Sequence, residues 1–146
     1  MNITWIDKKL AVSDIIDDYD YLRKKKIKKI INLRSECHDD LELLAKLGIG
    51  YYYIPIPDSF APRFNQIASF IDIVEKSPKN EKILVHCSEG KGRSIFMCLV
   101  YLIRTYNRSP EQAIEQLNHI RPSISVTPNQ EHKIKWYFEK YKAGEL

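Results

Sequence analysis

Short apolar runs alternate along the chain with segments whose apolar residues recur at helical spacing. Runs of four to eight mostly apolar residues are typical of buried strands, whereas a recurrence every three or four residues is typical of an amphipathic helix. The pattern predicts strands at 3–6, 10–12, 27–33, 51–54 and 82–86, and helices at 13–25, 39–47, 63–76 and 94–106. This alternation favours an α/β structure with a largely parallel sheet, after an initial hairpin formed by the first two strands.

Polar residues mark several helix starts. We expect Ser13 to cap the helix at 13–25. Ser109 and Thr127 each precede a proline and stand three residues before a glutamine, which is the pattern of a capping box with proline at the first helical position. The segment 94–106 is apolar on nearly every face, so we expect it to be a central, buried helix.

The composition is that of one compact soluble domain: 146 residues, 44% hydrophobic and 29% charged. The longest apolar run, 95–103, is too short to span a bilayer, and the N-terminus lacks a signal-peptide pattern, so we expect a cytoplasmic protein without stable membrane association. A net charge of +4 attracts anions but is too small to indicate nucleic-acid binding. Three cysteines leave room for a reactive thiol, and no Cys/His cluster has metal-ligand spacing.

The candidate chemistry lies in the loop 87–93. Cys87 follows the end of a predicted strand, Gly90 and Gly92 permit a tight turn, and Arg93 opens a predicted helix. Such a loop aims several backbone N–H groups at one point and forms an anion cradle, to which the helix N-terminus adds its positive end. The guanidinium of Arg93 is a planar fork that matches two phosphate oxygens.

The same positive field favours the thiolate form of Cys87 at neutral pH. The thiolate would lie beneath a bound phosphate, as in-line attack on phosphorus requires. Ser94 follows the arginine directly and can donate its hydroxyl to the sulfur when the sulfur becomes the leaving group.

The segment His86, Cys87, Gly90, Arg93 and Ser94 matches His-Cys-x5-Arg-Ser, the signature of the protein tyrosine phosphatase superfamily. Over almost its whole length the chain resembles the small atypical dual-specificity phosphatases, including short archaeal tyrosine phosphatases. The supporting segments are 5–13, 30–33, 54–58, 120–122 and 129–131. The resemblance implies a single domain over 1–146, with a central, mostly parallel sheet flanked by helices on both faces, and hydrolysis through a phosphocysteine.

The resemblance also implies roles outside the loop. Asp58 lies in a proline-rich loop between a predicted strand and helix, and acts as general acid in the first step and as base on water in the second. Gln130 either orients the hydrolytic water or serves only in the capping box. His86 tunes Cys87 by hydrogen bonding to the loop backbone. The implied phosphate-binding loop comprises Cys87, Ser88, Glu89, Gly90, Lys91, Gly92 and Arg93.

A second segment, 32–38, resembles a rim segment of the phosphoinositide 3-phosphatases in the same superfamily. Arg34 and Glu36 are expected to brace the loop 87–93, called the signature loop below, by an ion pair. Cys37 is either a simply exposed cysteine or the partner of Cys87 in a protective disulfide formed on oxidation. If Asp58 is not the acid, the next candidates are Asp39 and Asp40 beyond this segment.

Two loop residues bear on the substrate. Glu89 stands where many family loops carry Ala or Gly, and it either opposes a highly anionic substrate or is solvated or paired with Lys91. Lys91 resembles the basic loop residues by which phosphoinositide 3-phosphatases meet extra phosphates.

The favoured function is a phosphatase acting as a monomer on phosphorylated protein, with phosphotyrosine as first choice and phosphoserine and phosphothreonine open. Because no separate phosphotyrosine-recognition loop is evident, the pocket is expected to be shallow and to accept phosphate, sulfate or vanadate. The alternatives are an inositide, inositol-phosphate or RNA 5′-phosphate phosphatase and, from another class, a catalytically silent phosphate-binding module. No cofactor is expected, because Arg93 and backbone amides supply the charge that a metal would supply.

Overall fold

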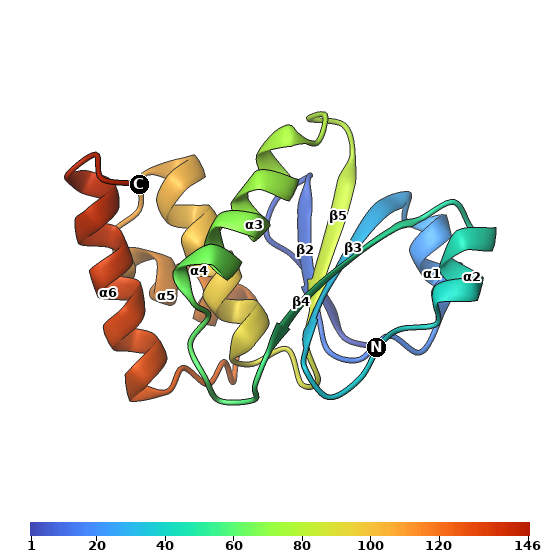
Figure 1. Cartoon of the computed structure of the whole chain (residues 1–146), viewed down its shortest axis with the longest axis horizontal. Coiled ribbons are helices and arrows are strands. Elements are labelled where there is room, and N and C mark those ends of the chain that lie inside the picture. The colour runs from blue at the N-terminus through green and yellow to red at the C-terminus, as the bar shows by residue number, and fades with distance from the viewer.

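A five-stranded sheet lies between two layers of helices in the computed structural model, which describes all residues, 1–146 (Figure 1). The strands are β1 (Ile3–Trp5), β2 (Leu10–Ser13), β3 (Ile27–Arg34), β4 (Gly50–Ile56) and β5 (Lys82–His86). The helices are α1 (Tyr19–Lys24), α2 (Leu41–Lys46), α3 (Phe64–Lys76), α4 (Arg93–Tyr106), α5 (Pro110–Ile120) and α6 (Pro128–Lys142). The predicted α/β class with helices on both faces is confirmed. No helix combines the length and the apolar character needed to span a membrane.

The strand order is β1-β2-β5-β3-β4, and every neighbouring pair except the β1–β2 hairpin is parallel. β5 occupies the centre, and its residues Ile83, Leu84 and Val85 have no exposed surface, as expected for a parallel strand covered on both faces. The carboxyl ends of the parallel strands therefore meet at one edge of the sheet. In Figure 1 the loops after β4 and β5 and the connection between α5 and α6 all lie at this lower edge.

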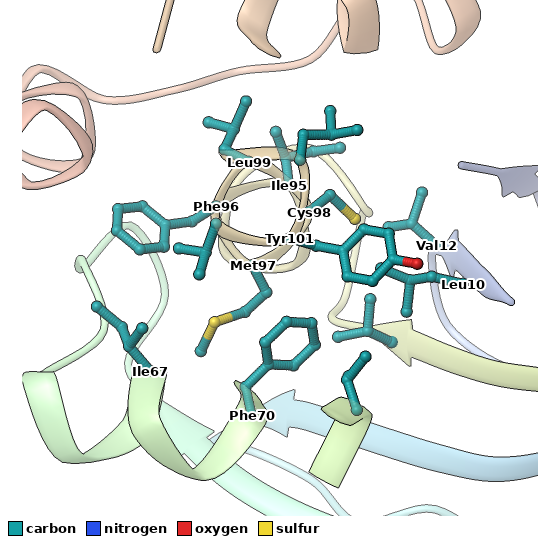
Figure 2. Packing of buried hydrophobic residues seen from close by; sticks show 14 of the residues in the cluster. Leu10, Val12, Ile67, Phe70, Ile95, Phe96, Met97, Cys98, Leu99 and Tyr101 are labelled. Atoms are coloured by element: carbon teal, nitrogen blue, oxygen red, sulfur yellow. The ribbon is translucent and has the colours of Figure 1, made fainter. Parts of the chain in front are cut away.

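Helix α4 is the centre of the larger core. Every residue from Ile95 to Ile103 is at most 5% exposed, so the predicted buried helix is confirmed. Figure 2 shows its side chains leaving the helix in every direction, toward Ile67 and Phe70 of α3 and toward Leu10 and Val12 of β2. Because α4 is packed on all sides, its N-terminal end is held firmly at the lower edge of the sheet.

The opposite face of the sheet carries a smaller core under α1 and α2. It includes Leu22 and Leu44, one from each helix, and Ala11, Ile30 and Leu84 from the sheet. The two helices are short, and both are capped by aspartate: Asp18 accepts from the backbone of α1 and Asp40 from that of α2.

One predicted helix is wrong in extent. The helix expected at 13–25 begins only at Tyr19, because Ser13 continues β2 and pairs with His86 of β5. The backbone N–H of Ile15 then donates to the carbonyl of Ser88, which ties this connection to the signature loop. The capping boxes at Ser109 and Thr127 are both present as predicted.

Candidate active site

The loop between β5 and α4 turns on Gly90. Its φ of +66° lies in the left-handed region, and a Cβ there would clash with the guanidinium of Arg121 and lie 2.9 Å from the backbone of Ser13. Arg121 Nε donates to the carbonyl of Gly90 at 2.8 Å, and its Nη1 reaches Thr4 Oγ1 at 2.9 Å. Arg121 thus ties the loop to β1; sequence reasoning placed this arginine only in a supporting turn.

Cys87 lies at the start of this loop and is 3% exposed. Ser94 Oγ lies 3.1 Å from its Sγ, and the backbone N–H of Gly90 donates to Sγ at 3.3 Å. Both neighbours can donate a hydrogen bond to a thiolate, and the N-terminal end of α4 adds the positive end of its dipole. The arrangement suits a sulfur that carries negative charge before attack and again when it leaves.

Arg93 is almost fully buried, with its guanidinium held on three sides. Nη1 donates to Glu36 Oε1 at 2.7 Å and to the carbonyl of Ile56 at 2.8 Å, while Nη2 donates to Glu36 Oε2 at 2.9 Å and to Ser88 Oγ at 3.3 Å. These hydrogen bonds from Arg93, with one from Ser88, hold the pKa of Glu36 well below its usual range. Hydrogen bonding to Glu36 in turn raises the pKa of Arg93.

Of the two rim residues, only Glu36 forms an ion pair with the signature loop. Arg34 and Glu36 do not pair with each other: Arg34 bonds Asp39, with 3.0 Å between Nη2 and Oδ1, and Glu36 bonds Arg93. The reason is their position, since Arg34 is buried at the end of β3 and Glu36 lies beyond it on the half-exposed rim. Cys37 is a free, exposed thiol.

A cavity of about 170 Å³ opens above Cys87. Asp58 reaches it from the loop after β4; its carboxylate is 81% exposed and its Oδ1 lies 3.7 Å from Arg93 Nη2. Gln130 reaches it from α6, where its Oε1 accepts the capping-box bond from Thr127 N and its Nε2 donates to the carbonyl of Phe60. The remaining lining residues are Ser59, Ser88, Glu89, Lys91, Gly92, Arg93, Ser125 and Thr127.

Three lining residues, Ser59, Ser125 and Thr127, had no place in the predicted site. Ser125 N donates to the carbonyl of Lys91 at 2.7 Å, so the connection before α6 is attached to the signature loop. The sequence signals near this connection were the Ile-Arg-Pro turn and the capping box at Thr127, and neither of them placed these residues at the site. Glu89 and Lys91 face each other on the rim with 3.8 Å between their charged atoms, which agrees with the paired reading of Glu89.

Asp39, named as a reserve general acid, is buried and does not line the cavity. Its Oδ2 lies 2.7 Å from His86 Nε2, and His86 Nδ1 lies 3.3 Å from the carbonyl oxygen of Cys87. Cys98, in α4, has its pKa raised by complete burial. No three His, Cys, Asp or Glu side chains converge in a way that could hold a metal ion.

Residues 11–140 match the family model of the dual specificity phosphatase catalytic domain. The chain belongs to this family. This dual-specificity phosphatase domain is 27% identical over 128 residues to a tyrosine-protein phosphatase CDC14 homolog of Schizosaccharomyces pombe, which covers 83% of the chain and 24% of that relative. It is 41% identical over 61 residues to the phosphatidylglycerophosphatase and protein-tyrosine phosphatase 1 of Mus musculus, covering 42% of the chain and 32% of the relative. The chain thus spans between about a quarter and a third of the length of these relatives.

Solved structures agree with this family. A mutant form of Tk-PTP superposes with a TM-score of 0.86 at 25% identity, over 97% of both chains. PTPMT1 in complex with PI(5)P superposes with a TM-score of 0.88 at 21% identity, over 99% of both chains, and that likeness shows the shared fold.

Proposed function

We propose that this protein is a cysteine-dependent phosphatase that hydrolyses phosphomonoesters through a phosphocysteine at Cys87. The observation that carries the proposal is the convergence, on one small cavity, of a thiol with two hydrogen-bond donors, a buried arginine and an exposed carboxylate. These groups are a nucleophile, a stabiliser of the phosphoryl oxygens and a proton donor, which together are sufficient for the reaction.

In the first step, the thiolate of Cys87 attacks phosphorus and forms the S–P bond while the P–O bond to the leaving group breaks. The leaving oxygen takes its proton from Asp58. In the second step, water attacks phosphorus, Asp58 takes the proton from the water, and the S–P bond breaks. The sulfur then leaves as a thiolate that accepts a hydrogen bond from Ser94, and inorganic phosphate is released.

Part of the Arg93 guanidinium is already hydrogen-bonded to protein groups before any substrate binds. Both N–H groups of Nη1 have protein partners, Glu36 and the carbonyl of Ile56, so Nη1 anchors the side chain. Nε–H has no protein hydrogen bond; one N–H of Nη2 donates to Glu36 at 2.9 Å, and the bond from Nη2 to Ser88 is long at 3.3 Å. We therefore assign Nε and Nη2 to two phosphoryl oxygens, with Glu36 fixing the plane of the guanidinium.

The charges around the cavity favour a substrate with one phosphoryl group. Its lining carries two cations, Lys91 and Arg93, and two carboxylates, Asp58 and Glu89. Glu89 partly neutralises the charge of Lys91, so the cavity has no group of unpaired cations that could bind a second or third phosphate. Phosphotyrosine on a protein is our first choice, and phosphoserine and phosphothreonine are also candidates because the opening is small and polar.

A lipid substrate is the second candidate. Lys91 is half exposed at the rim and can approach an anionic headgroup. A fold neighbour crystallised with PI(5)P and a relative named as a phosphatidylglycerophosphatase both fit this alternative.

The test compares turnover of five substrates: a phosphotyrosyl peptide, the matching phosphoseryl and phosphothreonyl peptides, PI(5)P in vesicles and a 5′-phosphorylated RNA. We expect the phosphotyrosyl peptide to have the highest kcat/KM, with competitive inhibition by vanadate and no effect of a chelator. Cys87→Ser should lose turnover and still bind phosphate. A preference for PI(5)P would favour the second candidate, a lipid substrate, over phosphorylated protein. Normal turnover by Cys87→Ser would overturn the covalent mechanism.

A further inference from the structure

The edge of the sheet opposite the candidate site is strongly basic. Four stretches lead into the parallel strands there: residues 7–9, 23–29, 46–49 and 76–82. In Figure 1 the connection from α3 into β5 lies at the upper edge, at the other end of the sheet from the loops after β4 and β5. The four stretches carry 12 of the chain's 23 lysines and arginines and only two of its 19 aspartates and glutamates. We call the surface that they form the amino edge.

Few of the charges on the amino edge are neutralised within the protein. Of its two carboxylates, Glu81 pairs with Lys29 at 3.3 Å, and Asp7 accepts hydrogen bonds from two tyrosine hydroxyls. Lys46 and Lys76 form only exposed pairs along the surface of their own helices, which contribute little stability. Six exposed lysines of the amino edge have no ion-pair partner: Lys8, Lys24, Lys25, Lys26, Lys28 and Lys79.

Lys26 stands where the backbone favours glycine. Helices α1, α2 and α6 end in the same way, with a left-handed residue two positions after the last helical residue. That residue is Gly48 after α2 and Gly144 after α6, but after α1 it is Lys26, with a φ of +61°. A lysine in this conformation costs stability that glycine would not cost. The helix dipole does not require the extra cation, because Lys24 and Lys25 already lie at this helix end.

The amino edge has the properties of a surface that binds a broad negative field. It extends across four parallel strands, a width of about 15 Å. Eleven of its 12 cations are lysines, which are flexible point charges and not the planar forks that match a single phosphate. None of the large exposed hydrophobic side chains lies in the four stretches, so the apolar anchors typical of a protein interface are missing.

The aromatic rings next to the amino edge are poorly placed to stack on nucleic-acid bases. Lys82 Nζ lies over the ring of Trp5, 5.1 Å from its centroid, and Lys25 Nζ lies over the ring of Tyr21 at 5.3 Å. Single-stranded nucleic acids are bound by free aromatic faces together with cations, and here a lysine of the same surface already covers one face of each ring. These contacts favour an anionic surface over a single strand.

We propose that the amino edge docks reversibly on a membrane surface rich in anionic lipids. Lysines near such a surface each add to binding, and charge without an inserted apolar group gives reversible attachment. The candidate active site then lies about 25 Å from the bilayer, the length of an eight-residue strand such as β3. Cys87 faces away from the lipid headgroups, so a docked molecule meets phosphorylated proteins and not phosphoinositides. In this last respect the proposal rests on the proposed function and favours a protein substrate.

Sedimentation with vesicles tests the docking without any turnover. We expect the protein to bind vesicles of phosphatidylcholine with phosphatidylserine, to be released by salt, and not to bind vesicles of phosphatidylcholine alone. A variant that combines Lys24→Gln, Lys25→Gln, Lys26→Gln and Lys28→Gln should bind the anionic vesicles about 10²-fold more weakly. No binding by the wild type overturns the proposal, and so does tighter binding to a DNA duplex than to these vesicles at the same salt concentration.

The matched control removes four charges from another face of the molecule. It combines Lys133→Gln, Lys135→Gln, Lys140→Gln and Lys142→Gln in α6, so its net charge equals that of the first variant. We expect this control to bind the anionic vesicles nearly as tightly as the wild type does. Equal weakening in the two variants would mean that net charge alone governs binding, which contradicts a docking face.

A single substitution separates charge from stability. Lys26→Gly should raise the melting temperature, because glycine fits the left-handed backbone, and should weaken binding to the anionic vesicles by about fivefold. The two effects have opposite signs, so weaker binding cannot be attributed to a damaged fold. A more stable variant that binds as tightly as the wild type contradicts the proposed use of this charge.

The orientation is tested by turnover of a soluble phosphotyrosyl peptide that does not itself bind the vesicles. We expect kcat/KM to be the same for the free protein and for the protein bound to phosphatidylserine vesicles, because the candidate site faces away from the bilayer. A large fall on binding would mean that the site faces the membrane and would overturn the proposal. Failure of the proposed function looks different: there would be no turnover with or without vesicles, while vesicle binding and its loss in the lysine variant would persist.

Discussion

Glu36 connects the two ends of the signature loop. Its carboxylate accepts from Arg93 at the end of the loop and from Ser88, one residue after the nucleophile, at 2.6 Å. The Arg93 bonds hold the pKa of Glu36 well below its usual value of about 4.3 in an unfolded chain. The folded protein therefore binds this proton less readily than the unfolded chain, so the stability that Glu36 contributes is present above that value and is lost as the pH falls below it.

Glu36→Gln should consequently lower the melting temperature at neutral pH, and the gap between wild type and variant should narrow progressively as the pH falls below about 4.3. Thermal melts followed by circular dichroism measure this gap. Glu42→Gln is the control, because Glu42 is 83% exposed and forms only a helix-surface pair with Lys46. A gap for Glu36→Gln that stays constant over this range would show that its ionisation is not coupled to folding.

At the scale of single residues, the sequence was sufficient to predict those site residues that lie close to one another in the chain. Cys87, Arg93 and Ser94 fall within one short segment, so their spacing alone places them on a common loop. The contacts of Asp39 and Arg121 were not predicted, because their partners His86 and Gly90 are 47 and 31 residues away and no local pattern encodes such a contact.

At the scale of secondary-structure elements, the β5–loop–α4 unit is built around a backbone that tolerates little change. β5 and α4 are buried on all sides, so the loop between them cannot relax by moving either end. Gly90 is the tightest point, since its left-handed φ and the contact with Ser13 leave no room for a side chain. The orientation of its N–H toward Cys87 Sγ depends on this conformation.

Gly90→Ala should therefore reduce turnover by about 10²-fold, the effect of displacing reacting groups by an ångström or so. Gly48→Ala is the control, because Gly48 has a similar φ of +70° but no atom within 4 Å of the added Cβ. Both variants should lose about 1 kcal/mol or more of stability from the left-handed backbone, and only Gly90→Ala should lose activity. Equal activity in the two variants would mean that the loop adapts to a side chain.

Strands and helices with clear apolar patterns or complete capping signals were predictable, whereas the end of β2, which depends on strand pairing, was not. α3, α5 and α6 began close to where their apolar spacing and caps placed them. The segment after Ser13 was misassigned because serine before an apolar run resembles a helix cap, whereas pairing with His86 keeps the residue in β2. Such pairing overrides a local preference of about 1 kcal/mol.

At the scale of the whole molecule, the candidate site is assembled at the carboxyl edge of the sheet from segments that are far apart in the chain. The acid loop is attached to the start of α6, since Gln130 Nε2 donates to the carbonyl of Phe60 and Thr127 Oγ1 to that of Ser59. These bonds hold Asp58 over the cavity without burying it. The sequence predicted the strand, loop and helix around Asp58 but could not fix its distance from Arg93.

Asp58→Asn should lower turnover of a phosphotyrosyl peptide by about 10²- to 10⁴-fold, the usual contribution of a positioned proton transfer. The first step should be nearly unaffected for an aryl phosphate whose leaving group is a strongly acidic phenol and needs no proton. Single-turnover kinetics on both substrates measure the difference. An equal, modest loss on both would mean that Asp58 only shapes the loop.

The central claim is the phosphocysteine, and trapping it is the most direct test. With an activated aryl phosphate, Asp58→Asn should form the intermediate normally but hydrolyse it slowly, because the base that activates water is missing. Rapid quenching followed by peptide mass spectrometry should then find the added mass of one phosphoryl group on the peptide containing Cys87, and none in Cys87→Ser. A phosphoryl group on any other residue, or turnover with Cys87 never labelled, would contradict the mechanism.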